Sequence, residues 1–291
     1  MPCAWLSDLI AGRPTDPPLA AASSEAAASP LWLLFEVGWN SLGAFVESGH
    51  IPPARYLDTG SFEGEPLWNA REDAVLTETA LANGITAETT VILYGRDQLA
   101  AARVAHLLLY LGVRDVRMLD GSFAAWTAAG LAVETGVATS PVPAKSFGCA
   151  VPARPELMID LAGAKALLAR PRSEAALVSI RSRAEFDGVT SGYSYISARG
   201  CIPGALWGRA GNDGCSSSMS AYVDSQGRMT SAAEIQAMWH EQAIKPDMQL
   251  AFHCGTGWRA SLAFWFAWLM GFPRIAVYDG GWLEWSQQAK Q

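Results

Sequence analysis

Short apolar runs alternate with amphipathic stretches along most of this chain. The apolar runs predict buried strands, and the stretches that repeat apolar residues every three or four positions predict helices. Strands that alternate with helices are typical of a parallel sheet covered on both faces, the α/β class. The pattern predicts strands over 31–37, 89–94, 176–180 and 250–254 with one more ending at Leu119, and helices over 4–11, 72–82, 97–111, 160–169, 231–243 and from about 260 onward.

The same succession of motifs occurs twice. Asp279-Gly-Gly-Trp282 matches Asp120-Gly-Ser-Phe123 at a shift of 159 residues, and Gly200-Cys-Ile-Pro203 matches Gly49-His-Ile-Pro52 at a shift of 151 residues. An insertion in the second copy accounts for the difference between the two shifts. We therefore predict two copies of one α/β unit. The expected order is a lead-in helix and loop over 1–30, a first domain over 31–135, a proline-rich linker over 136–155 and a second domain over 156–291.

Composition narrows the class of partner. The 291 residues suffice for two domains, and the net charge of −7 without any basic run argues against a nucleic-acid surface.

We see neither a leader segment nor an apolar run long enough to cross a membrane, so we expect no membrane contact and a cytoplasmic location, or a periplasmic one if an export signal has been removed. The odd number of widely spaced cysteines, without a Cys-x-x-Cys pair, predicts no zinc site and no disulfide framework. They are Cys3, Cys149, Cys201, Cys215 and Cys254.

One stretch carries the strongest chemical signal. Residues 250–271 predict a buried strand, a six-residue loop from Cys254 to Arg259, and a helix. Glycines at two loop positions let the backbone curl until successive N–H groups point inward, and the helix adds the positive end of its dipole. A lone cysteine at a strand end is usually a packing residue. The glycines, the arginine and the helix together favour a reactive Cys254 whose thiolate is stabilised by the loop.

The neighbours of Cys254 have alternative roles. Arg259 could form a surface ion pair, but its place at the end of an anion cradle favours anion binding. Thr256 supplies either a hydroxyl to the bound anion or only a small loop residue, and Trp258 forms either a pocket wall or a packing contact. His253 precedes the cysteine, and because side chains alternate along a strand it is expected to point away from the thiol.

The first copy lacks this chemistry. The shift of 159 residues places Gly95 under Cys254 and Ala100 under Arg259, so the first domain has neither the thiol nor the loop arginine. We expect it to be inactive. Arg96 and Asp97 could contact the other domain, but we favour an ordinary solvated turn.

These motifs resemble those of the rhodanese-type sulfurtransferases, in particular tandem members with an inactive first domain and an active second one. The resemblance implies two rhodanese-like domains, each a parallel sheet with helices on both faces. It also implies a persulfide on Cys254, with Gly255, Thr256, Gly257, Trp258 and Arg259 around the substrate. The matching segments are Gly49-His-Ile-Pro52, Leu67-Trp-Asn69, Thr190-Ser-Gly-Tyr-Ser-Tyr195, Cys254-Gly-Thr-Gly-Trp-Arg259 and Tyr278-Asp-Gly-Gly-Trp282.

The chain also departs from that family. Relatives often place a substrate-binding arginine where this chain has Glu185, so we expect Arg259 to have taken over donor binding. Arg181 follows the first strand of the active domain, after Ser179 where relatives have Asp, and is expected to be structural. Cys201 replaces the usual histidine, and we interpret it as a small turn residue rather than a resolving cysteine.

The expected activity is transfer of a sulfur atom from thiosulfate, through Cys254, to cyanide or a thiol. No metal or organic cofactor is expected. Two alternatives remain: 3-mercaptopyruvate as the donor, and a persulfide carrier that receives sulfur from a cysteine desulfurase and delivers it to a protein partner. Related phosphatases have five residues between the cysteine and the arginine of the loop; this chain has only 255–258 there, which predicts a cradle too small for phosphate.

Overall fold

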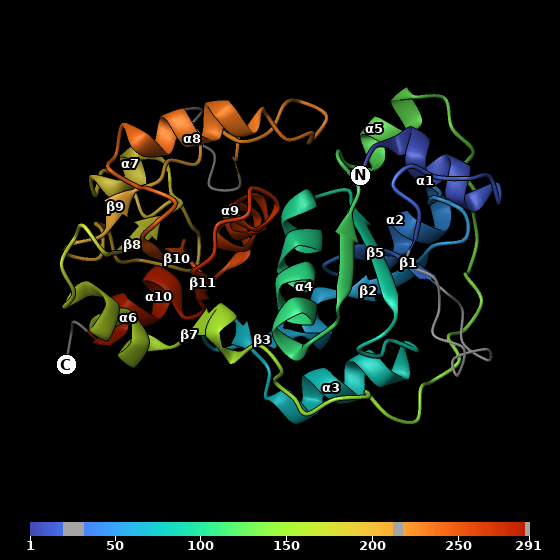
Figure 1. Ribbon diagram of the computed structural model, residues 1–291, viewed down its shortest axis with the longest axis horizontal. Helices are drawn as coiled ribbons and strands as arrows, with labels where there is room; N and C mark the ends of the chain where they lie inside the picture. Colours follow the sequence, from blue (N-terminus) through green and yellow to red (C-terminus); the bar gives the residue numbers. More distant parts are fainter. Residues whose placement is uncertain (20–31, 212–217, 289–291) are drawn as a thin grey trace. The chain divides into compact units, whose positions relative to one another are not determined.

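The computed structural model describes residues 1–19, 32–211 and 218–288 (Figure 1). It divides into two compact units, and each is described by itself. Cys215 and the expected loop over 20–30 lie outside the described residues. The first unit comprises 1–63, 70–154 and 226–228, and the second comprises 64–69, 155–225 and 229–291.

The first unit is built on a parallel sheet in the order β2-β1-β5-β6. Its central strands are the apolar runs of the sequence, buried along nearly their whole length because helices cover both faces. The strands are β1 (Trp32–Gly38), β2 (Arg55–Asp58), β5 (Thr90–Gly95) and β6 (Asp115–Met118), and the short β3 (Glu63–Gly64) and β4 (Asn69–Ala70) pair with each other.

Two sets of helices cover this sheet. Side chains of one face, among them Leu34 and Ile92, form a core cluster with Trp5, Phe45 and Trp126 from three helices. The helix α4 packs on β1, β5 and β6 and is buried along its whole length. The helices are α1 (Cys3–Ile10), α2 (Leu42–Glu47), α3 (Asp73–Ala82), α4 (Gln98–Leu111) and α5 (Phe123–Ala128).

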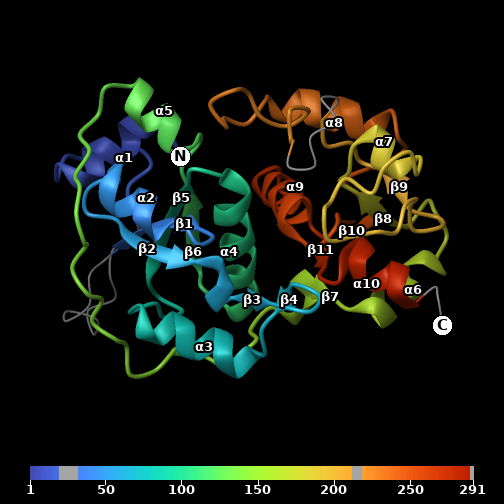
Figure 2. The same ribbon diagram turned by 180° about the vertical axis from the view of Figure 1, so that it is seen from behind.

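The second unit repeats this plan with a parallel sheet in the order β7-β11-β10-β8-β9 (Figure 2). Strand β10 lies in the middle of the sheet and is paired on both sides, so its carboxyl end opens where two neighbouring strands also end. The strands are β7 (Met158–Ile159), β8 (Ala175–Ser179), β9 (Leu206–Trp207), β10 (Gln249–His253) and β11 (Ile275–Tyr278).

Helices again lie on both faces of the second sheet. Leu177 and Ala251 pack with α6 and α10 in one core cluster, and Phe252, which points the other way along β10, contacts Trp239 of α8. Helix α9 packs on β10 and β11. The helices are α6 (Leu161–Leu168), α7 (Arg183–Phe186), α8 (Ala232–His240), α9 (Trp258–Leu269) and α10 (Gly281–Gln288).

The predicted long elements are all present, and two predicted boundaries were wrong. Helix α8 ends at His240 rather than at 243, and α9 begins at Trp258 rather than near 260. The second difference matters for the site. Gly257, at φ +126°, already occupies the N-cap position, so Arg259 lies in the first turn of the helix and not in the loop.

Candidate active site

Strand β10 carries Cys254 to the carboxyl edge of the sheet. The strand ends at His253, and the next residue turns into a short loop over 254–257 before α9 begins. Cys254 is only 2% exposed. The thiol therefore lies inside the unit, surrounded by backbone rather than by water.

The loop directs one amide group toward the sulfur. The Gly257 N–H donates a hydrogen bond to Sγ of Cys254 over 3.2 Å. Gly257 has a left-handed φ of +126°, which side chains rarely adopt, so a glycine is required where the chain enters α9. The N-terminal end of α9 adds its partial positive charge to the same place. This is the anion-stabilising arrangement that the sequence predicts.

A second helix holds the loop from behind. The N–H groups of Trp282 and Leu283, in the first turn of α10, donate to the carbonyl oxygens of Cys254 and Gly255 at 2.8 Å and 3.0 Å. A side chain at Gly281 would place its Cβ 2.6 Å from the Gly255 carbonyl oxygen. The Gly-Gly-Trp motif is therefore explained by the loop: it brings a helix N-terminus against the loop carbonyls, which leaves the amides free to face the opposite way.

Arg259 is paired within the protein. Its guanidinium donates to both carboxylate oxygens of Glu185, over 2.9 Å and 2.8 Å, and both side chains are almost fully buried. Of the guanidinium nitrogens, only Nε has no hydrogen-bond partner among the described residues. From the sequence we expected Arg259 to bind the donor. This pairing conflicts with that role, because the guanidinium face that would receive an anion is occupied by a carboxylate.

Glu185 joins several parts of the site. It closes a capping box with Ser182 at the start of α7 and also accepts a hydrogen bond from Arg181 over 3.4 Å. Burial by itself raises the pKa of Glu185, but the hydrogen bonds and charge of Arg259 lower it more, and the net pKa lies below the usual value. The cluster contains two guanidinium groups and one carboxylate, which leaves one positive charge beside the loop.

Tyr193 lies against the same loop. Its hydroxyl accepts a hydrogen bond from the Gly255 N–H over 2.9 Å and another from Nη2 of Arg259. A Cβ at Gly255 would lie 2.3 Å from Cζ of Tyr193, so only glycine allows the ring to pack there. Gly192, at φ +79°, has no room for a side chain next to Glu185. The Thr190–Tyr195 motif thus serves to place one phenol on the cysteine loop.

Arg181 is structural, as expected. It is completely buried and donates to the carbonyl oxygens of Gly200 and Ser191 at 2.7 Å and 3.0 Å. Its guanidinium also lies 5.3 Å from the ring centroid of Trp282. Arg181 therefore connects the end of β8 to the segment that carries Tyr193.

His253 is buried and neutral. Burial, followed by the charges of Arg181 and Arg259, lowers its pKa to about 3. Its Nδ1 lies 3.3 Å from the backbone oxygen of Cys254, and its Nε2 has no partner among the described residues. A histidine with so low a pKa is a poor proton acceptor at neutral pH, which agrees with the minor role expected for it.

Other predicted residues fall close to the loop. Thr256 is 6% exposed within it, and Trp258 is half-buried at the first position of α9. Trp282 belongs to the core cluster, and Asp279 follows the last residue of β11. Cys201 is half-buried next to the turn closed by the Ala205 N–H on the Ile202 oxygen. Cys3, Cys149, Cys201 and Cys254 are free thiols.

The corresponding loop of the first unit lacks the thiol and is capped by its own carboxylate. Gly95 stands in the position of Cys254, and Asp97, in the position of Thr256, caps α4 through a 2.9 Å hydrogen bond from the Leu99 N–H. The chain's own carboxylate thus takes the helix N-terminus that an external anion would use. Interpreting Arg96 as part of a solvated turn was wrong: it pairs with the buried Glu36 over 2.9 Å.

A family comparison agrees with both units. The rhodanese-like domain matches twice, over residues 34–129 and 162–288. The chain belongs to the rhodanese-like family. Its second rhodanese-like domain carries Cys254, and its first carries the capped loop described above.

Three relatives place it further. The thiosulfate sulfurtransferase YnjE of Escherichia coli strain K12 is 47% identical over 98% of this chain, which spans 62% of that protein, and its crystal structure superimposes with a TM-score of 0.93 at 46% identity, covering 100% of this chain and 67% of that one. An anaerobic ergothioneine biosynthesis enzyme from Chlorobium limicola, solved with its natural substrate trimethyl histidine, has a TM-score of 0.88 at 36% identity over 99% of this chain and 68% of that one. The sulfur carrier protein TtuD of Thermus thermophilus is 28% identical over 82% of this chain and 83% of its own length.

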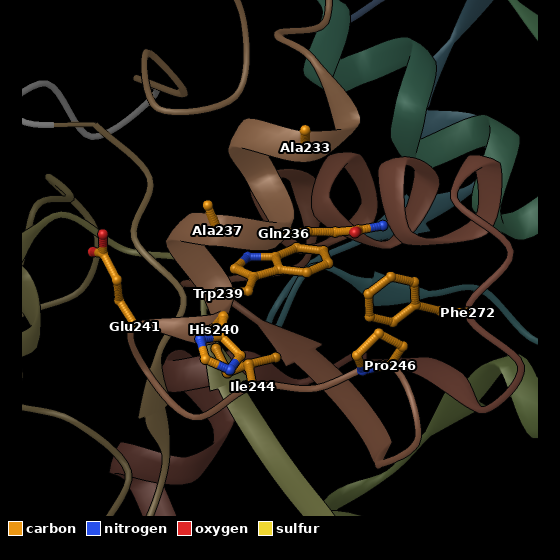
Figure 3. A pocket seen from close by; sticks show the side chains of 9 residues that line it. All are labelled: Ala233, Gln236, Ala237, Trp239, His240, Glu241, Ile244, Pro246 and Phe272. Atoms are coloured by element: carbon orange, nitrogen blue, oxygen red, sulfur yellow. The ribbon is translucent and has the colours of Figure 1, made fainter.

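A surface pocket of the second rhodanese-like domain lies apart from these residues. It has a volume of about 570 Å³ and is lined by α8 and the segment after it, with Trp239, His240 and Phe272 around it (Figure 3). None of the predicted site residues lines it. Within the described residues there is no metal-binding cluster of His, Cys, Asp and Glu, and no helix is long and apolar enough to span a bilayer.

Two functional residues were missed from the sequence. Glu185 was noticed only as a departure from the family, and Tyr193 only as part of a motif. Two glycines give these side chains their room. A side chain at Gly192 would collide with Glu185, and one at Gly255 would collide with Tyr193. Such close approaches cannot be recognised without the tertiary structure.

Proposed function

We propose that this chain is a sulfurtransferase that takes the outer sulfur of thiosulfate onto Cys254 and passes it to a thiol or to cyanide. The observation that carries the proposal is the sulfur environment: Sγ of Cys254 accepts a hydrogen bond from the Gly257 N–H, and two helix N-termini converge on the loop. Such a site stabilises a negative charge on sulfur, first as thiolate and then as persulfide. The similarity to YnjE supports thiosulfate as the donor.

The reaction has two steps. The Cys254 thiolate attacks the outer sulfur of thiosulfate, the sulfur–sulfur bond of the donor breaks, and sulfite leaves with its electron pair. The new persulfide carries the negative charge on its outer sulfur. Cyanide or a thiolate then attacks that sulfur, and Cys254 leaves as the thiolate. No redox partner is needed, because both steps are nucleophilic displacements.

The loop residues have different parts in this proposal. Gly257 supplies an amide to the sulfur, Gly255 allows Tyr193 to approach, and Thr256 and Trp258 line the approach to the thiol. Arg259 contributes charge from behind the loop through its contacts with Glu185 and Tyr193. This differs from direct donor binding by the guanidinium.

The test is a donor panel with matched variants. We expect the wild-type protein to give a higher kcat/KM with thiosulfate than with 3-mercaptopyruvate. After thiosulfate treatment, mass spectrometry should locate one added sulfur on the peptide that contains Cys254. Cys254→Ser should abolish transfer, and Cys201→Ser should not. Labelling of Cys201, or transfer by Cys254→Ser, would refute the assignment.

The same experiment separates the alternatives. A preference for 3-mercaptopyruvate would identify that compound as the donor. Persulfide transfer from a cysteine desulfurase that is much faster than thiosulfate turnover would indicate a carrier, as the name of TtuD suggests for that relative. A second panel compares sulfur acceptors. It includes trimethyl histidine, because the Chlorobium limicola enzyme was solved with that compound. Cell fractionation would test the expected cytoplasmic location.

A further inference from the structure

We propose that the Tyr193 hydroxyl donates a hydrogen bond to the sulfur that Cys254 carries, and so transmits the charge of Arg259 to the reacting atom. This rests on the proposed function of Cys254 as the sulfur-carrying residue. It assigns a hydrogen-bond donor that lies outside the cysteine loop itself.

The Tyr193 hydroxyl has one hydrogen bond left to make. A phenol oxygen accepts two hydrogen bonds and has one proton to donate. Both acceptor positions of Tyr193 are taken, by the Gly255 N–H and by Arg259. No acceptor for its proton is recorded among the described residues. The hydroxyl therefore keeps one proton that it can donate to a group that enters the site.

The Tyr193 hydroxyl lies beside the residue that follows Cys254. Gly255 directly follows Cys254, and a Cβ on it would lie 2.6 Å from Oη of Tyr193. The phenol thus replaces the Gly255 amide as the group that faces the site, and its O–H extends farther from the backbone than the N–H does. The Gly257 N–H reaches Sγ itself at 3.2 Å. A sulfur added beyond Sγ lies farther from this amide. The phenol is close enough to the thiol that, after burial, the charge of Cys254 is among the causes that raise the pKa of Tyr193.

Arg259 also donates a hydrogen bond to the Tyr193 hydroxyl. Glu185 accepts hydrogen bonds from both terminal nitrogens, and the further hydrogen bond recorded for the guanidinium goes to the Tyr193 hydroxyl. Its guanidinium carbon also lies 5.3 Å from the centroid of the Tyr193 ring. A hydroxyl that accepts hydrogen bonds from a cation and an amide becomes a stronger donor, because the hydrogen bonds polarise one another. Burial raises the pKa of Tyr193, so the hydroxyl keeps its proton at neutral pH.

The chemical consequence is stabilisation without proton transfer. When sulfite leaves, negative charge appears on the outer persulfide sulfur, and the O–H of Tyr193 donates to it. In the second half-reaction the acceptor takes that sulfur and the charge returns to Sγ of Cys254. The hydrogen bond then breaks, and no proton or electron has to be supplied.

The test compares Tyr193, which is partly buried, with the buried Tyr222. Tyr193→Phe retains the ring that packs on Gly255 and removes only the oxygen. We expect the rate of persulfide formation from thiosulfate to fall roughly 10- to 100-fold, the range for a lost hydrogen bond to a charged group, mainly in kcat rather than KM. Tyr222→Phe is the matched control, because its hydroxyl is buried and joins Gly208 to Trp239. It should lower Tm without changing kcat.

A double-mutant cycle tests the route from Arg259. If the arginine acts through the phenol, Arg259→Lys should slow persulfide formation in the wild-type protein but have little further effect in Tyr193→Phe. Effects that multiply would contradict the proposal. A Tyr193→Phe rate within twofold of wild type, with the persulfide still formed on Cys254, would overturn this inference and leave the proposed function intact. Failure of the wild-type protein to form that persulfide would overturn both.

Discussion

The buried His253 makes the stability of the second unit depend on pH in a calculable way. In the unfolded chain this histidine takes up a proton near pH 6.5, whereas in the folded protein burial and the charges of Arg181 and Arg259 lower its pKa to about 3. Between these two values unfolding takes up a proton, so the free energy of unfolding decreases as pH falls. The stabilisation from keeping His253 neutral is fully present above pH 6.5.

The magnitude follows from these two pKa values. At pH 5 the folded histidine is still neutral and the unfolded one is almost fully protonated, so lowering the pH from 7 to 5 costs about 2 kcal/mol through His253 alone. This figure depends almost entirely on the unfolded pKa. His253→Gln removes the titrating group and should remove this part of the pH dependence.

The assay is urea denaturation of the wild-type and variant proteins at pH 7 and pH 5. Hydrogen exchange of peptides from β10 would report unfolding of the second unit specifically. The exposed His240 provides the control, and His240→Gln should lose as much stability as wild type. If His253→Gln lost the same free energy as wild type between pH 7 and pH 5, the histidine would have to be accessible to protons in the folded state and the reasoning would be refuted.

Three further predictions follow from the site. Gly255→Ala should destabilise the protein by roughly 1–3 kcal/mol in denaturant titrations and slow sulfur transfer at least tenfold, because its Cβ would lie 2.3 Å from Cζ of Tyr193; Gly43→Ala, with open space around it, should do neither. Glu185→Ala leaves two buried guanidinium groups without their carboxylate and should cost about 3–5 kcal/mol by thermal or urea unfolding, and a smaller loss would mean that water replaces the carboxylate. The unmodified protein should not hydrolyse aryl phosphates, because the loop is one residue shorter than in related phosphatases; hydrolysis that disappears in Cys254→Ser would argue against sulfur transfer.

Local patterns were enough to predict the architecture. Apolar runs and helical periodicity depend on neighbouring residues, so the alternation of strands and helices, the repeat and the rhodanese-like resemblance could all be read before folding. The same holds for the candidate nucleophile. Cys254 stood out because the glycines and the helix that are proposed to activate it are adjacent in sequence. The conformation of such a loop depends mainly on consecutive residues, which the sequence shows directly.

Contacts between distant residues could only be seen in the tertiary structure. Glu185 and Arg259 are 74 positions apart, and Tyr193 and Arg259 are 66 apart. Sequence reasoning assigned Arg259 to the substrate because it saw an arginine beside an anion cradle and had no means of finding the carboxylate that folding brings to it. Folding pairs buried charges because a lone one is costly to desolvate. The sequence therefore indicates which atom is proposed to react, and the tertiary structure decides which groups surround it.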